Sequence, residues 1–126
     1  MSGFAGIIHL DDAPVDNISL SCMAEQSEIH GGDARGTLCC KHFGFSHSLL
    51  RTTFESDQEA QPLTFDGQCW IVGDIRIDAR RELVNNLMAA GRDANLEQPD
   101  IELAFHAWHA WKEKCVNYLC GDFAFI

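Results

Sequence analysis

Ser2 is the first residue of the chain whose type and position suggest chemistry. A nucleophilic side chain on the first residue of a protein can use its own α-amine as the general base. The reference pKa of that amine is about 7.7–8.0, so part of it is neutral near pH 7. With Met1 attached, however, the nitrogen of Ser2 is an amide and cannot act as a base. Ser2 is therefore either a candidate nucleophile that needs removal of Met1, or merely a small residue before a strand.

A second candidate group consists of Glu102, His106 and His109. Spacings of four and three residues place these side chains near one face of a helix, and carboxylate and imidazole groups bind transition metals. No fourth ligand is evident, and no C-x-x-C pair indicates a structural zinc site. We therefore expect no metal here, and interpret the histidines as the edge of an aromatic helix.

Composition and charge narrow the class of protein. The 126 residues, 46% hydrophobic and 22% charged, fit one globular domain with a buried core. A net charge of −10 without a Lys/Arg cluster argues against binding to nucleic acids or anionic membranes. No apolar run approaches the ~18 residues of a membrane helix, and no basic stretch precedes the first apolar run. We expect a cytoplasmic protein.

The cysteines are also consistent with a cytoplasmic protein. Without a secretory signal, and with a plausible core, reduced buried thiols are expected in place of disulfides. The expectation covers all six cysteines: Cys22, Cys39, Cys40, Cys69, Cys115 and Cys120.

The first half of the chain predicts a strand, a helix and further strands. Residues 3–10 form an apolar run of strand length. A helix to about residue 30 is expected, capped by Asp16 or Asn17. A loop at 31–36 precedes strands at 37–40 and 43–50, with a tight turn at 42–44, and a polar loop follows at 53–62. Asp66-Gly67 predicts a hairpin between 63–65 and 68–72. The apolar set of this first helix comprises Ile18, Leu20, Cys22, Met23 and Ile29.

The second half predicts two helices and a last strand. Asp78 is expected to cap a helix that ends at Gly91, with an apolar stripe of Leu83, Val84, Leu87 and Met88. After a loop at 92–99, a helix capped by Asp100 should bury Ile101, Phe105, Trp108 and Trp111 on one side. A helical turn at 115–119 leads to a strand at 121–126. Strands and helices cluster separately, which indicates an α+β fold.

Four segments stand in a telling order along the chain: MSGFAGIIHL, LLRTTFESDQEAQPL, CWIVGDIRIDARREL and PDIELAFHAWHAWKEKCVNYLCGDFAF. They resemble segments of the class II glutamine amidotransferases, and of the asparagine synthetase group in particular. They match, respectively, the family's Met-Cys-Gly start, its Arg-led segment ending in Gln-Pro-Leu, its Asn-Gly-Glu turn, and its Ser-Asp-x-Glu helix with Leu-x-Gly-x-Phe-Ala-Phe. The resemblance implies an N-terminal-nucleophile (Ntn) hydrolase-like αββα sandwich with antiparallel sheets, incomplete at its C-terminus. It implies a partial glutaminase domain over residues 1–126.

The resemblance assigns roles to four further residues. Arg51 matches the arginine that holds the carboxylate of glutamine, for which a guanidinium fork is suited. Gly73 matches the glycine whose N–H stabilises the oxyanion, and Asp100 matches the aspartate that binds the α-ammonium. Asp74 stands where the family usually has Glu, as a substrate-binding position. Three of them also have an ordinary structural interpretation: Arg51 as a surface cation, Gly73 as a turn and Asp100 as a helix cap.

Two departures from the family pattern concern catalysis. Ser2 replaces the nucleophilic Cys, and a hydroxyl is far less acidic than a thiol. Val72 replaces the Asn that donates to the oxyanion, and loss of one such donor typically costs 10²–10³ in rate. Together these departures predict an impaired glutaminase. The alternative is a non-catalytic domain that supports a synthetase or cyclase partner and still binds glutamine or another amino acid.

The resemblance also bears on cofactors and partners. The synthetase's Ser-Gly-Gly-x-Asp pyrophosphate loop is absent from these residues, so ATP and Mg²⁺ are expected only for a synthetase domain that this chain lacks. The chain itself is expected to hold no cofactor. A sheet interrupted at its C-terminus would leave unpaired edges, which predicts a homodimer.

Overall fold

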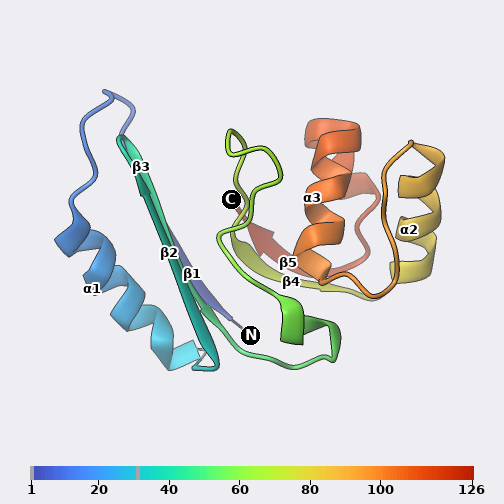
Figure 1. Ribbon diagram of the computed structural model, residues 1–126, viewed down its shortest axis with the longest axis horizontal. Helices are drawn as coiled ribbons and strands as arrows, with labels where there is room; N and C mark the ends of the chain where they lie inside the picture. Colours follow the sequence, from blue (N-terminus) through green and yellow to red (C-terminus); the bar gives the residue numbers. More distant parts are fainter. Residues whose placement is uncertain (1, 31) are drawn as a thin grey trace. The chain divides into compact units, whose positions relative to one another are not determined.

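The computed structural model of the chain describes residues 2–30 and 32–126 (Figure 1). Predictions that concern Met1 or Gly31 lie outside these residues. The described residues cluster in two compact units. Unit 1 takes in the described residues of Met1–Thr52, together with Ala60–Asp74 and Phe125–Ile126, and unit 2 takes in Thr53–Glu59 and Ile75–Ala124. Each unit is described by itself.

Unit 1 is built on a three-stranded antiparallel sheet. Its strands are β1 (Gly3–Ile8), β2 (Ala34–Cys40) and β3 (Phe43–Leu49), in the order β1-β3-β2. In this register the central His47 lies opposite Phe4 on β1 and Gly36 on β2. Because side chains alternate along a strand, these three positions share one face of the sheet. Gly44, of opposite parity, faces Val15 and Leu20, so the helix α1 covers the other face.

Helix α1 (Asn17–Ser27) begins where predicted and packs differently from the prediction. Asp16 is its N-cap and accepts hydrogen bonds from the backbone N–H groups of Ile18 and Ser19. Leu20 alone of the predicted apolar set is buried, whereas Ile18 is 74% and Ile29 is 80% exposed. The face that meets the sheet runs through Leu20 and Ser27, and Ile18 points elsewhere. The helix continues as a 3₁₀ turn, η1 (Glu28–His30).

The strands of unit 1 depart from the prediction at their ends. The first strand ends at Ile8 and leaves Leu10 97% exposed. Strand β2 begins at Ala34, inside the predicted loop, because a long partner strand extends its pairing. The turn that follows uses Lys41 at a φ of 35°. The predicted hairpin reduces to a single bridge between Leu63 and Ile71. In its turn, Oδ1 of Asp66 accepts hydrogen bonds from the backbone N–H groups of Gln68 and Cys69.

The strand that leads from unit 1 into unit 2 begins later in the chain than the sequence predicted. Strand β4 (Gly73–Ile77) pairs with β5 (Gly121–Phe125) in a second sheet, and the polar loop before it contains the 3₁₀ turn η2 (Glu55–Gln58). The apolar run that ends at Val72 predicted a strand over 68–72, yet Val72 itself pairs only with Ile126. The partner strand that decides the start of β4 lies more than forty residues away in sequence and is invisible to local periodicity.

Unit 2 owes its core to helices α2 (Arg80–Ala89) and α3 (Asp100–Trp111), followed by η3 (Lys112–Asn117). The predicted Asp78 cap is wrong, because α2 starts two residues later and the Asp78 carboxylate accepts from Arg76. Met88 is 60% exposed and does not belong to the core stripe. Trp108 and Trp111 are half-buried. The buried residues of the two helices include Leu83, Val84, Leu87, Ile101, Leu103 and Phe105.

The observed class agrees with the prediction, and the cysteine environment does not. Three α-helices and two small antiparallel sheets in the described residues make an α+β fold, consistent with part of an Ntn-hydrolase-like fold. All six cysteines are free, as expected, but only Cys115 is buried. Cys22 on α1, Cys39 on β2 and Cys120 just before β5 are exposed. Within the described residues, no helix is both long enough and apolar enough to span a membrane.

Candidate functional site

Ser2 lies half-buried just before β1, with both of its polar groups engaged. Its backbone nitrogen donates to Oδ1 of Asp74 at 2.8 Å, across 72 residues of sequence. Its Oγ accepts from the backbone N–H of Leu50 at 3.0 Å. The predicted nucleophile is therefore held from both sides, by the end of β3 and by β4. A carboxylate next to the Ser2 nitrogen favours the positively charged form of any amine at that place.

The two positions expected to stabilise an oxyanion offer no unengaged donor. Val72 is fully buried and its backbone exchanges two hydrogen bonds with Ile126, at 3.1 and 2.9 Å. The N–H of Gly73 donates to Oε1 of Gln61 at 2.7 Å, and Nε2 of Gln61 donates back to the Gly73 carbonyl at 3.0 Å. Gln61 is buried. One side-chain carboxamide thus occupies both backbone groups of Gly73.

His47 lies behind this turn, on the sheet face that Gly36 and Phe4 share. Its side chain is 4% exposed, and burial lowers its pKa to about 4. The Asp74 carboxylate and a hydrogen bond to the Gly73 backbone act in the opposite direction, but burial outweighs both. The imidazole is consequently neutral at pH 7. Its Nε2 is buried without a hydrogen-bond partner among the described residues.

Arg51 directs its polar groups to Asp33. Its backbone N–H donates to Oδ2 of Asp33 at 2.7 Å, and its Nη1 donates to the Asp33 carbonyl at 3.2 Å. Both residues are exposed. The structure therefore places Arg51 one residue beyond Leu50, which bonds Ser2, while its guanidinium braces the start of β2.

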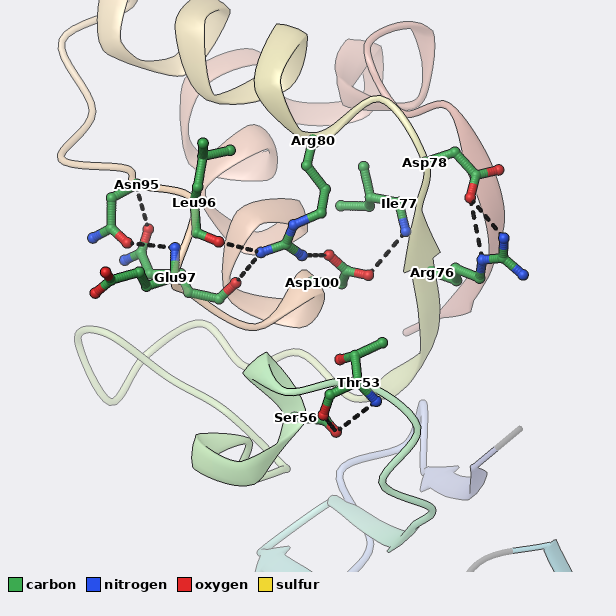
Figure 2. Close-up of polar contacts among 11 residues, drawn as sticks. Thr53, Ser56, Arg76, Ile77, Asp78, Arg80, Asn95, Leu96, Glu97 and Asp100 are labelled. Carbon is green, nitrogen blue, oxygen red and sulfur yellow. Dashed lines mark hydrogen bonds and ion pairs between the residues drawn. The ribbon is translucent and has the colours of Figure 1, made fainter.

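Asp100 belongs to unit 2 and is half-buried there. Its Oδ2 accepts from the backbone N–H of Ile77 at 2.9 Å, and its Oδ1 pairs with Arg80 (Figure 2). Arg80 in turn donates to the carbonyls of Leu96 and Gln98, at 2.8 and 2.7 Å. The N-cap of α3 is Pro99, so the predicted capping role of Asp100 is wrong. The carboxylate ties α3 to β4, the start of α2 and the loop before α3.

The histidines of α3 have partners other than a metal. Among the described residues, no three His, Cys, Asp or Glu side chains are grouped as metal ligands. His106 is buried, with Nδ1 at 3.2 Å from Nη2 of Arg92 and Nε2 at 3.4 Å from Nε2 of Gln98. Burial first, and then Arg92 and His109, lower the pKa of His106. Burial raises the pKa of Glu102.

Unit 1 thus brings together Ser2, Gly73 and Asp74 from distant parts of the chain. Sequence reasoning missed His47 and Gln61, which complete this cluster. Gln61 lies in the Gln-Pro-Leu segment that carried the family resemblance, which was a signal for it. His47 is a titratable residue within an apolar strand, and only its burial in the structure draws attention to it.

Comparison with known proteins supports the family resemblance found in the sequence. A sequence family described as a glutamine amidotransferase domain matches residues 1–126, the whole length of the chain. None of the curated proteins matches it.

Proposed function

Since the chain belongs to the glutamine amidotransferase domain family, we propose that it is a glutaminase-like domain of the asparagine synthetase-related type in which hydrolysis of glutamine is impaired. In the family role, the domain hydrolyses glutamine and supplies ammonia for ATP-dependent amide formation. In this proposal a synthetase or cyclase domain or partner uses ATP and Mg²⁺ and determines the acceptor, and the chain itself holds no cofactor.

The observation that carries the proposal is the state of the oxyanion position. Val72 has no side-chain donor, and the N–H of Gly73 is bonded to Gln61. A tetrahedral intermediate formed at Ser2 would meet no unengaged donor from either residue. Since one lost donor costs about 10²–10³ in rate, the loss of both leaves little catalysis. Ser2 adds a weaker nucleophile to the same position.

The nucleophile step itself would need an activated Ser2. Hydrolysis would start with attack of Oγ on the carboxamide carbon of glutamine, while the α-amine of a Met1-free chain takes the hydroxyl proton. The Ser2 nitrogen instead faces the Asp74 carboxylate at 2.8 Å. An ammonium held at that carboxylate has no lone pair with which to accept a proton.

The second candidate function is a non-catalytic domain, and the contacts favour a supporting role over amino-acid binding. Arg51 and Asp100 are the residues expected to hold an amino acid. Arg51 donates to Asp33, and Asp100 pairs with Arg80. Both side chains thus already serve contacts within the protein, which a role as the folded partner of a synthetase domain leaves intact.

Glutamine hydrolysis tests the proposal. The chain is released from a cleavable N-terminal fusion so that Ser2 becomes its first residue, and ammonia release is compared with that of Ser2→Ala. We expect equal, background rates. Ammonia release that Ser2→Ala abolishes would overturn the proposal and establish Ser2 as a working nucleophile.

Restoration of the family residues is the complementary test. Ser2→Cys combined with Val72→Asn should raise ammonia release above background, with Ser21→Cys and Val116→Asn as matched exposed controls that do not. Circular dichroism verifies that Asn is tolerated at the buried position 72. A folded double variant without activity would show that features beyond these two residues limit hydrolysis.

The homodimer expected from exposed sheet edges remains a proposal. In the three-stranded sheet, β1 and β2 are the outer strands, and β1 carries no charged residue or proline to discourage pairing. Sedimentation at high protein concentration tests it, and a monodisperse monomer would contradict it.

A further inference from the structure

The Gly73 peptide is held from more than one side. The carboxamide of Gln61 makes two hydrogen bonds to it, one to the N–H at 2.7 Å and one to the carbonyl at 3.0 Å. His47 hydrogen-bonds the same backbone. The Gly73 carbonyl has two lone pairs and can accept from both side chains. Asp74 is the next residue, so its direction depends on how this peptide is oriented.

The sheet supports this arrangement at Gly36. This residue lies opposite His47 in the β2–β3 register, and a Cβ built on it would collide with the carbonyl oxygen of Gln61. The main chain of Gln61 therefore packs against the backbone of β2 at Gly36, which has no side chain. From there its side chain reaches Gly73.

The ring contacts of His47 select one tautomer. Its Nε2 is buried without a partner among the described residues. The hydrogen bond to Gly73 is therefore made by Nδ1. This bond favours the protonated ring, as a bond to an acceptor does, so the Gly73 carbonyl accepts it. A neutral ring that donates from Nδ1 leaves Nε2 as an unprotonated acceptor.

We propose that His47, as its Nδ1–H tautomer, and Gln61 are positioning residues that hold the Gly73 peptide and thereby keep the Asp74 carboxylate on the Ser2 nitrogen, so that a Ser2 amine exposed by removal of Met1 is held as an ammonium and not as a base. The carboxylate, 2.8 Å from that nitrogen, stabilises the charged form. This inference rests on the Ser2–Asp74 contact used in the proposed function and deepens it, because it assigns the residues that position the carboxylate.

The direct test measures the α-amine of the Met1-free chain. ¹⁵N-labelled protein with Ser2 as its first residue is titrated by NMR, beside Asp74→Asn. We expect the α-amine pKa to lie above its reference range of about 7.7–8.0, and to return to that range in Asp74→Asn. A pKa within or below the reference range in the unsubstituted chain would overturn the proposal.

A matched pair of substitutions tests the positioning role of His47. The amide nitrogen of Asn sits near the place of imidazole Nδ1, whereas that of Gln extends to the place of Nε2. His47→Asn should keep the raised α-amine pKa, and His47→Gln should lose it. Equal titration of the two variants, in either direction, would contradict a role specific to Nδ1.

A measurement on the unsubstituted chain keeps the proposal testable if a variant does not fold. Long-range ¹H–¹⁵N spectra distinguish the two neutral tautomers of a histidine ring. We expect His47 as Nδ1–H at pH 7, and an Nε2–H ring would overturn the proposal. The ammonia assay is independent: glutamine hydrolysis dependent on Ser2 would refute the proposed function, whereas these titrations alone decide the positioning of Asp74.

Discussion

The helical core of unit 2 and the sheet of unit 1 bury different chemistry. Between α2 and α3 the buried side chains are chiefly apolar, with Leu87 and Leu103 fully enclosed. In unit 1 the central strand β3 buries Ser46, His47 and Ser48 in succession. Apolar burial needs only shape and volume, whereas a buried polar group must find a partner or costs free energy. Unit 2 should therefore respond chiefly to lost volume, and unit 1 to lost partners.

The largest expected effect is on the apolar side of this comparison. Phe105 on α3 is 1% exposed. Phe105→Ala should lower the free energy of unfolding by about 3–5 kcal/mol, because it removes a large buried side chain and leaves a cavity. Urea denaturation followed by tryptophan fluorescence measures it. Met88→Ala, at a 60% exposed position of α2, is the control and should stay within about 0.5 kcal/mol.

The next effect tests the polar side through pH. His47 takes up a proton near pH 6.5 when unfolded and near pH 4 when folded. Between these values the unfolded state binds more protons, so the free energy of unfolding falls as the pH falls, by about 3 kcal/mol in total. Among the described residues, Asp74 is the charged group that acts on His47.

Denaturation of the unsubstituted chain and of His47→Asn at pH 7 and pH 4.5 isolates this contribution. The variant lacks the titrating ring and should lose correspondingly less stability on acidification. Equal losses of unfolding free energy in the two proteins would mean that protonation of His47 does not cause the loss.

A smaller effect separates a structural from a ligand-binding role for Asp100. Asp100→Asn should cost about 2 kcal/mol, because hydrogen bonds to charged groups typically contribute that much and the half-buried Arg80 loses its counter-charge. A double-mutant cycle with Arg80→Met should show positive coupling between the two residues. A variant as stable as the unsubstituted chain would indicate a carboxylate kept for a ligand.

The smallest effect concerns the cap of α1. Asp16→Ala should destabilise the chain less than Asp100→Asn does, since it leaves two N–H groups at the exposed helix start without their acceptor. The bonds from Ile18 and Ser19 also lower the pKa of Asp16, so this contribution is lost in acid. Thermal unfolding compares the variant with Glu25→Ala, an exposed position within the same helix. A cost equal to that of the control would exclude a capping contribution.

The predictable parts of the fold are those with local causes. The stripe of Leu83, Val84 and Leu87 indicated a buried helix face, and Asp16 indicated a helix start, because each signal lies within a few residues. Leu20 shows the limit. The sequence offered several apolar residues on α1, but which of them is buried depends on the face that the small residues of the sheet accept.

Some residues of the candidate site could likewise be predicted from the sequence, and others could not. Ser2, Gly73 and Asp74 were found through resemblance, and the structure brings Ser2 and Asp74 into contact. His47 and Gln61 had no local signal for their roles, because each acts on a peptide that follows much later in the chain. The engagement of Asp100 with Arg80 was likewise absent from the prediction, since one carboxylate can cap a helix, bind a ligand or pair with a cation.

The sequence by itself determined the class of the molecule, an acidic α+β domain of the glutamine amidotransferase family, whereas the assignment of Ser2 and Val72 to the nucleophile and oxyanion positions stays a prediction. Only the tertiary structure decided that the Gly73 N–H is bonded to Gln61 and that Asp74 faces the Ser2 nitrogen. The physical reason is that residue types specify which groups can donate or accept, whereas the partner of each group depends on which strands the fold brings within hydrogen-bonding distance.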